Sequence, residues 1–423
     1  MRKISLVLSA MMLTMAGITA SAQELTMPER WTRSLMYVRP IFKQDTLTIR
    51  VLGDVMMHSA QIKNAHRGGS EYDFSSYFSL IEDQIKEADI AIANMEFTLA
   101  GEPYSGYPCF SAPDTLADYL ADCGFDIFLA ANNHIFDKGA KGAERTLEIY
   151  RRLEAEKGIK FIGLAGNEDE LTRSNPLIIR SKGIQLALLN ATYGTNLGVG
   201  ARWPETNYLS ARSKMESALS KAKKADADLT MVFPHWGTEY VLRHSASQEE
   251  TAKWLARNGA DMIIGVHPHV IQDFQMLEIS DEESSHDVPV AYSLGNAVSN
   301  MSAKNTQLEL MATVRIVMHG NGDVEILPLE FTYLWCSRPG GFRDSYTVVP
   351  VEEYIGRKEE WLGPWEYDKM VDTYIYVKEQ TGIEDKNTKT INEQEKHQTG
   401  SHRSYRDLWS SKQESGGSLQ LFS

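Results

Sequence analysis

The sequence contains little cysteine, and its three cysteines follow no metal-binding pattern. The spacing of Cys109, Cys123 and Cys336 fits no zinc finger, and none of the three is expected to be catalytic. Cys109 and Cys123 could pair in an oxidising compartment, although the odd number of cysteines leaves any pairing open. Cys123 lies in a helix-like run and is expected to be a small core residue.

Positive charge is also scarce. The chain has 43 Lys and Arg against 57 Asp and Glu, which gives a formal net charge of −14. Removing Arg2 and Lys3 with an N-terminal leader would change this from −14 to −16, because residues 1–22 contain no acid. Nucleic-acid binding needs a basic surface, so nucleic acid is not expected as the main partner.

Long apolar runs are confined to the N-terminus. Arg2 and Lys3 precede an apolar run over residues 4–20, and the small residues at 20–22 form a cleavage site, so residues 1–22 are expected to be a signal peptide. An uncleaved anchor helix is the alternative, but the run is short for a membrane span. The mature protein is therefore expected to be exported, periplasmic or extracellular, without a lipoprotein anchor or a later span.

The remaining residues, about 400 in number, suit one large α/β domain with additions. We expect a leader over residues 23–44, the domain over 45–335 and an aromatic appendage over 336–378 that packs on it. Residues 379–423 are mostly polar and are expected to form a disordered tail.

The domain alternates strand-like and helix-like patterns, and two hairpins interrupt the alternation, which predicts mixed sheets. The predicted strands include 46–52, 89–93, 125–129, 159–164, 229–233, 261–266 and 288–294. The predicted helices are 76–88, 116–123, 143–156, 210–225 and 248–258, and the predicted hairpins cover 177–189 and 308–334.

Polar side chains follow most of these strands at the point where the apolar run stops. In an open α/β sheet this edge, at the carboxyl ends of the strands, is where ligands bind. For residues 132–134 alone, an Asx-turn with an incidental histidine explains the pattern equally well, but the recurrence at other strands favours a site. The residues are Asp54, Glu96, Asn133, His134, Asp137, His235, His267 and His269.

This set offers oxygen and imidazole ligands without thiolate, which suits one or two divalent first-row metal ions such as Mn, Fe or Zn. His267 and His269 are one residue apart, so in extended backbone both side chains leave on the same side. Two bound metals would lower the pKa of a shared water and stabilise negative charge in a transition state. The histidines at 58, 66, 244, 286 and 319 are expected to be ordinary core or surface residues.

Six segments together carry a resemblance to a known family. They are 53–56 (GDVM), 93–96 (ANME), 131–139 (ANNHIFDKG), 235–240 (HWGTEY), 259–269 (GADMIIGVHPH) and 293–296 (SLGN). Over residues 46–300 the chain resembles the CapA family, which is named for poly-γ-glutamate capsule synthesis and belongs to the calcineurin-like metallophosphoesterases. The resemblance implies a four-layer α/β/β/α sandwich with a metal centre at the strand tips.

The resemblance also implies roles for individual residues. The implied metal ligands are Asp54, Glu96, Asn133, His235, His267 and His269, with Glu96 as the bridge. His134, supported by Asp137, is implied to donate a proton or a hydrogen bond to the reacting group. The superfamily usually has histidine two residues after the first aspartate, where this chain has Met56, so one metal site is expected to be weaker or built differently. His58 could replace that histidine, although a surface position is favoured.

Two functions follow as expectations. The first is an exported metal-dependent hydrolase or transferase that acts on a cell-envelope polymer or a small phosphoester, with capsule-synthesis proteins as candidate partners. The second is a non-catalytic module that binds a polymer or helps assembly and has an attenuated metal site. The Asn133–His134 pair and the two histidines at 267 and 269 favour catalysis, whereas Met56 favours the binding module.

Overall fold

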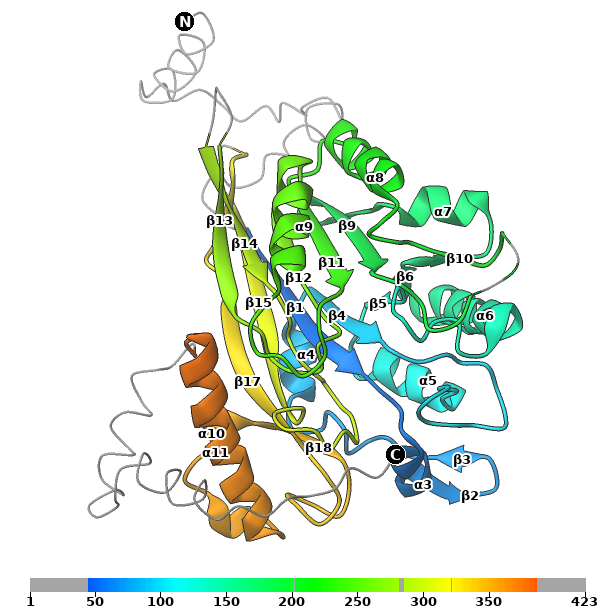
Figure 1. Ribbon diagram of the computed structural model, residues 1–423, viewed down its shortest axis with the longest axis vertical. Coiled ribbons are helices and arrows are strands. Elements are labelled where there is room, and N and C mark those ends of the chain that lie inside the picture. The colour runs from blue at the N-terminus through cyan, green and yellow to red at the C-terminus, as the bar shows by residue number, and fades with distance from the viewer. Residues whose placement is uncertain (1–44, 199, 201, 281–284, 321, 386–423) are drawn as a thin grey trace, which may run out of the picture. The chain divides into compact units, whose positions relative to one another are not determined.

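The computed structural model describes residues 45–385, apart from residues 199, 201, 281–284 and 321, and two β-sheets dominate this part of the chain. Figure 1 shows the two sheets with helices on their outer faces. The predicted signal peptide (1–22), the leader (23–44) and the part of the predicted tail after Asp385 lie outside the described residues.

The first sheet has eight strands in the order β18-β17-β15-β1-β4-β5-β6, with β16 paired to β15. The strands β1, β4, β5 and β6 run parallel, so their carboxyl ends share one edge, while β15 and β17 are antiparallel additions. The bounds are β1 (Asp45–Val55), β4 (Ile90–Met95), β5 (Ile127–Leu129), β6 (Lys160–Ile162), β15 (Leu308–Met318), β16 (Val324–Ile326), β17 (Glu330–Ser337) and β18 (Thr347–Pro350).

The second sheet has six strands in the order β13-β14-β12-β11-β9-β8. Its centre is parallel and both edges are antiparallel, and the hairpin predicted over 177–189 is confirmed as β8–β9. The sequence analysis did not anticipate β13. The bounds are β8 (Leu177–Ser181), β9 (Ile184–Thr192), β11 (Leu229–His235), β12 (Met262–Ile264), β13 (Phe274–Ser280) and β14 (Ser285–Ala291).

Helices and short strands complete this region. On the outer face of the first sheet lie α4 (Glu82–Glu87), α5 (Asp114–Asp122) and α6 (Gly139–Lys157), and on that of the second lie α8 (Arg212–Lys224) and α9 (Ala246–Arg257). The other elements are α3 (Ser59–Ala65), α7 (Glu168–Ser174), β2 (His66–Gly68), β3 (Glu71–Tyr72), β7 (Leu164–Ala165) and β10 (Glu205–Thr206).

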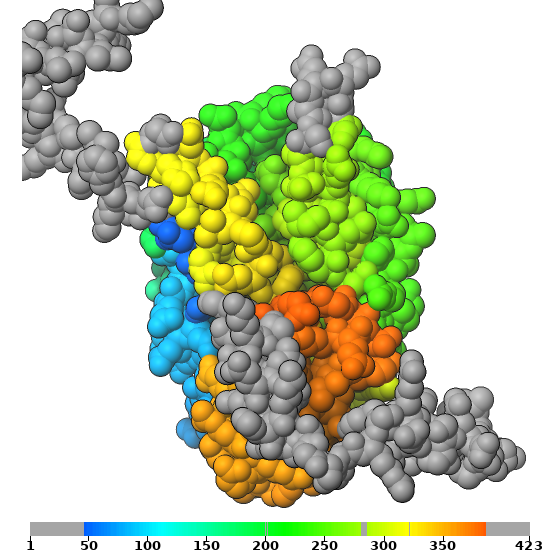
Figure 2. Space-filling model, turned by 90° about the vertical axis from the view of Figure 1, so that its left-hand side faces the viewer, coloured from blue at the N-terminus to red at the C-terminus, as the bar shows by residue number. Residues whose placement is uncertain are grey.

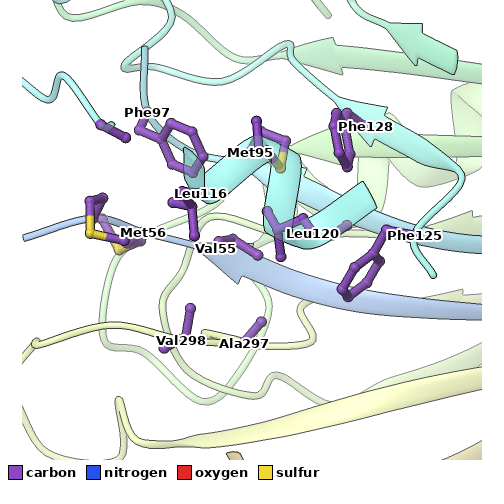
Figure 3. Packing of buried hydrophobic residues seen from close by; sticks show 14 of the residues in the cluster. Val55, Met56, Met95, Phe97, Leu116, Leu120, Phe125, Phe128, Ala297 and Val298 are labelled. Carbon is purple, nitrogen blue, oxygen red and sulfur yellow. The ribbon is translucent and has the colours of Figure 1, made fainter. Parts of the chain in front are cut away.

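Three apolar clusters hold the layers together. Successive side chains of a strand point to opposite faces of the sheet, so one strand contributes residues to the clusters on both of its faces. In β9, Leu186 and Leu188 enter the cluster between the two sheets, whereas Leu189 and Ala191 enter the cluster under α8 and α9. A third cluster, part of which is shown in Figure 3, joins the first sheet to α4, α5 and α6. The order helix, sheet, sheet, helix confirms the expected four-layer sandwich with mixed sheets.

The C-terminal segment packs on the first sheet. It comprises α10 (Val351–Tyr354), η1 (Lys358–Glu360) and α11 (Pro364–Thr381), and Figure 2 shows it in orange against the yellow strands of the first sheet. The buried carboxylate of Glu366 fixes α11, since it accepts hydrogen bonds from the Ser337 hydroxyl at 2.8 Å and from the Gln307 amide at 2.8 Å. Of the two tryptophans in this segment, Trp361 is buried but Trp365 is exposed.

The packed region extends beyond the predicted start of the tail at residue 379. α11 continues to Thr381, and the side chains of Ile383 and Asp385 are also buried. The Tyr333 hydroxyl donates a hydrogen bond to the Ile383 carbonyl at 3.1 Å. Residues 379–385 therefore belong to the folded region.

Two further expectations concern cysteines and membrane spans. Cys109, Cys123 and Cys336 are all unpaired, and Cys123 is buried in the core as expected. Among the described residues, none of the helices has both the length and the apolar character needed to cross a membrane.

Two truncations test where the folded region ends. Deleting residues 379–423 should lower the melting temperature by a few degrees, because burial of Ile383 alone is worth about 1.5–3 kcal/mol. Deleting only residues 386–423, which are polar in sequence, should leave it nearly unchanged. Equal melting temperatures for the two truncated proteins in a calorimeter would show that residues 379–385 add nothing to stability.

Candidate metal centre

Five strand ends from the two sheets meet at one place (Figure 1). Asp54 lies in β1, Glu96 directly follows β4 and Asn133 follows β5, all in the first sheet. His235 ends β11, and the loop after β12 carries His267 and His269. All six predicted ligands are buried. Five of them, all except Asn133, share groups whose ligand atoms lie close enough to hold a metal ion, and Asn133 lies against His235.

The carboxylate of Glu96 is the middle of this arrangement. It is fully buried, and neither of its oxygens has a hydrogen-bond partner among the described residues. The Nε2 atoms of His235, His269 and His134 lie 3.7, 3.8 and 4.0 Å from its Oε1 atom. These distances are too long for hydrogen bonds, so three imidazoles surround a carboxylate that none of them satisfies.

The remaining oxygen ligands are held in place by hydrogen bonds. Asp54 accepts one from the Asn94 amide at 2.7 Å and another from the backbone N–H of His267 at 3.1 Å. Asn133 Oδ1 lies 2.8 Å from His235 Nε2, and so joins a loop of the first sheet to a strand of the second.

Burial shifts the pKa values of Glu96, His235 and His267 in the directions that favour their uncharged forms. Burial, and then the charge of Asp54, raise the pKa of Glu96 well above its ordinary value. Burial lowers the pKa of His235 and His267, and the neighbouring imidazoles lower both further. His235 and His267 are therefore neutral, which is the form that binds metal, and a cation would favour the ionised form of Glu96.

Three groups of side chains have ligand atoms within 4.8 Å of one another and could each hold a metal ion. Glu96 belongs to two of them, as a bridge between neighbouring ions would. The unpartnered oxygens of Glu96 and the unpartnered Nδ1 of His267 fit such a role. The groups are Glu96 with His235 and His267, Asp54 with Glu96 and His269, and Glu239 with His267 and His269.

The backbone around His267 and His269 differs from the prediction. β12 ends at Ile264, and the two histidines have φ angles of 101° and 58°, so the expectation of extended backbone is wrong. Non-glycine residues adopt this region only where the surroundings impose it. A hydrogen bond of 2.9 Å from the Tyr240 N–H to the Pro268 carbonyl holds the loop, and both side chains still reach the centre.

A close backbone contact fixes where Asp54 lies. The pairing of β1 with β4 shifts register between Leu52 and Asp54, a bulge that re-aims the aspartate. A Cβ atom at Gly53 would lie 2.0 Å from the Gly295 carbonyl oxygen, so only glycine fits there. The Asp54 N–H donates to that same oxygen at 3.0 Å.

His134 and Asp137 form a pair beside the centre. Asp137 Oδ2 lies 2.7 Å from His134 Nδ1 and also accepts a hydrogen bond from the Phe110 N–H at 2.8 Å. With its proton on Nδ1, His134 turns Nε2 toward Glu96. The simpler Asx-turn interpretation also holds locally, because the Asn132 side chain accepts a hydrogen bond from the His134 N–H at 3.0 Å.

The position that holds histidine in related proteins is apolar here. Met56 is buried in the cluster shown in Figure 3, among residues that include Val55 and Phe97, and belongs to none of the metal-binding groups. His58 is half-buried rather than at the surface, and its Nδ1 lies 3.1 Å from the Gln61 side chain. Burial lowers the pKa of His58 to about 4. Neither residue supplies the missing imidazole.

Several residues at the centre have no role that the sequence patterns predicted. Glu239 is exposed and was noted only within the segment 235–240. Asn94 holds Asp54, and Asn296 Oδ1 lies 3.0 Å from His269 Nδ1. Asn94 lies in β4 and Asn296 follows β14 by five residues, and both belong to segments that carry the resemblance, which was the available signal.

Residues 48–301 match the family model described as bacterial capsule synthesis protein PGA_cap, which is more than half of the chain. The chain belongs to this family. The capsule biosynthesis protein CapA of Bacillus anthracis is 28% identical to it over 71% of this chain and 72% of the relative. The PGA biosynthesis protein CapA of Bacillus subtilis (strain 168) is 24% identical over 68% and 73%.

Solved structures with some similarity to this PGA_cap chain were also found. The calcineurin-like phosphoesterase YfkN of Bacillus subtilis is 12% identical and has a TM-score of 0.38, covering 79% of this chain and 100% of that one. The NAD nucleotidase NadN of Haemophilus influenzae is 12% identical, with a TM-score of 0.42 and coverage of 84% and 68%.

Metal binding should raise the stability of the PGA_cap protein measurably. A divalent ion at a hundredfold excess over its Kd should stabilise the fold by about 3 kcal/mol, and a chelator should reverse the effect. Glu96→Ala should abolish the metal-dependent shift in melting temperature, because it removes the carboxylate shared by two groups. His66→Ala, an exposed histidine, serves as the control and should shift as the unaltered protein does. A full shift in Glu96→Ala would mean that the ion binds elsewhere.

Proposed function

We propose that the protein is an exported metal-dependent hydrolase or transferase that cleaves or transfers a bond in a cell-envelope polymer or a phosphoester. The observation that carries the proposal is the buried carboxylate of Glu96, with three imidazole Nε2 atoms within 4.0 Å of Oε1 and no hydrogen-bond partner among the described residues. A buried carboxylate in such surroundings is costly without a cation.

Two adjoining sites for divalent ions account best for the side chains. Asn133, His235 and His267 would complete one site with Glu96, and Asp54 and His269 would complete the other. Oxygen and imidazole ligands suit Mn, Fe or Zn. Such ions supply Lewis acidity and activate water at neutral pH.

His134 is the proposed acid–base group. The carboxylate of Asp137 holds the His134 proton on Nδ1 and fixes the ring, while the edge of the ring packs on Phe110 with 4.7 Å between centroids. Nε2 then faces the centre and can exchange a proton with the reacting group. Because its side chain is buried, His134 is kept in this orientation.

The proposed substrate comes from the relatives. Both curated relatives are named for biosynthesis, one of capsule and one of PGA, so an anionic capsule polymer is the first substrate to test. Partners in capsule synthesis are part of the same proposal. Export rests on the N-terminal segment of the sequence, residues 1–22.

A second function is favoured by one observation. Met56 is buried in apolar surroundings, so the site at Asp54 and His269 lacks the imidazole expected there. A protein with one weakened metal site could bind the polymer or help assembly without catalysis. Purified protein supplied with Mn, Fe or Zn should hydrolyse a generic phosphodiester if it is an enzyme, and bound metal without any turnover would favour the binding module.

His134 and His267 should separate chemistry from metal binding. His134→Ala should keep most of the metal but lose about 10²–10⁴-fold in kcat, the range for a general acid or base. His267→Ala should lose metal and activity together, because its imidazole belongs to two of the ligand groups. Metal analysis and kinetics on both variants decide the assignment. Normal turnover in His134→Ala, or full metal content in His267→Ala, would refute it.

Glu239 is the proposed replacement for the missing imidazole. It is the exposed member of the group with His267 and His269, whose ligand atoms lie within 4.8 Å. Glu239→Ala should therefore lower the molar ratio of bound metal, measured by elemental analysis after dialysis, while Glu249→Ala on α9 should not. Unchanged metal content in Glu239→Ala would show that Glu239 is not a ligand, and the site would then have only Asp54, Glu96 and His269.

A further inference from the structure

A cavity of about 370 Å³ adjoins the metal centre, and the proposed reaction makes no use of it. Tyr193 forms a wall common to both. Its ring lies 4.7 Å from the ring of His267 between centroids, and its N–H donates to the His235 carbonyl at 2.8 Å. The opposite wall comes from the first turns of α8 and α9. A group bound in the cavity is therefore a neighbour of any substrate at the centre.

Arg212, the first residue of α8, is the charged residue lining this cavity. Its guanidinium lies over the Trp254 ring, 4.1 Å from the centroid, and one nitrogen donates to the Thr251 hydroxyl at 3.2 Å. The Nη1 atom has no hydrogen-bond partner, and no carboxylate within the described part of the chain lies within 4.0 Å of the guanidinium. Glu216, one turn further along α8, acts on it only through its charge.

The other lining groups add to the positive character of the cavity. Ser245 caps α9, so the positive end of the helix and the N–H groups of its first turn face this region. Thr238, Ser247 and Thr251 provide hydroxyl donors. An arginine, a helix N-terminus and hydroxyls together form the kind of surroundings that bind carboxylate or phosphate oxygens.

We propose that this cavity is a subsite for an oxyanion, a carboxylate or phosphate group of the substrate, and that Arg212 is its main binding residue. The proposal rests on the proposed function and deepens it, because it names the residues that would hold an anionic group of the substrate beside the same metal centre. The formal net charge of −14 would otherwise repel such a chain, so local positive groups beside the centre are needed to hold it. Arg212 positions the substrate and takes no part in the chemistry.

The test measures equilibrium binding of two probes to the full-length, metal-supplied protein by calorimetry. The probes are a γ-linked glutamate oligomer, which offers carboxylates, and inorganic phosphate. Arg212→Gln should weaken binding of at least one probe about tenfold or more, as expected for a charge-assisted hydrogen bond. Arg212→Lys should recover part of the affinity, because it keeps the charge but loses the fork of donors.

Matched variants separate the subsite from general charge effects and from misfolding. Arg257→Gln makes the same change of charge at the far, exposed end of α9 and should bind both probes normally. Ser247→Asp should fold well, since an acid in the first turn of a helix is favourable, yet should repel the oxyanion. The metal content of each variant should equal that of the unaltered protein.

The outcomes also distinguish the subsite from the proposed reaction. Weaker binding in Arg212→Gln and Ser247→Asp, but not in Arg257→Gln, supports the subsite even if no substrate is ever hydrolysed. The probe that loses affinity identifies the group as carboxylate or phosphate. Unchanged affinity for both probes in Arg212→Gln and Ser247→Asp, or an equal loss in Arg257→Gln, would overturn the subsite and leave the catalytic proposal standing.

Discussion

The burial of one carboxylate governs the chemistry of this protein. Glu96 is fully removed from water, and no described donor satisfies its oxygens. Such a group either keeps its proton or requires a cation, because an isolated buried charge costs several kcal/mol or more. Burial also lowers the pKa of His235 and His267, so these two imidazoles are neutral and can act as ligands but not as counter-charges to the carboxylate. The two sheets bring these groups together and exclude water from them.

The strand ends and the polar residues that follow them could be predicted because both depend on local patterns, whereas the four layers and the ligand roles were implied by the family resemblance. An apolar run that stops at Asp54 or at His235 marks a strand end, and parallel strands place their carboxyl ends at one edge. Contacts between distant segments were not accessible in this way. The left-handed backbone at His267 and His269 depends on a hydrogen bond from Tyr240, and Glu239 enters the site on an exposed loop. No local pattern of apolar and polar residues indicates the backbone conformation of the two histidines or the approach of Glu239 to them.

The interior around Met56 is apolar at the position where the family resemblance implies a histidine ligand. Methionine fills irregular gaps, and here it extends the apolar cluster to the edge of the centre. The fold therefore gains packing where an imidazole would need polar partners. Glu239 is exposed and lies in a group with His267 and His269, so its carboxylate could complete the ligands without entering the core.

The ligands are divided between two sheets, and this division has a consequence for the lifetime of the folded protein. Asp54 and Glu96 belong to the first sheet, whereas His235, His267 and His269 belong to the second, more than a hundred residues later in the chain. The centre forms only after the sheets have packed, so a bound ion cannot speed folding by joining early segments. It would instead tie the sheets together and slow their separation, which makes the ion a source of kinetic stability.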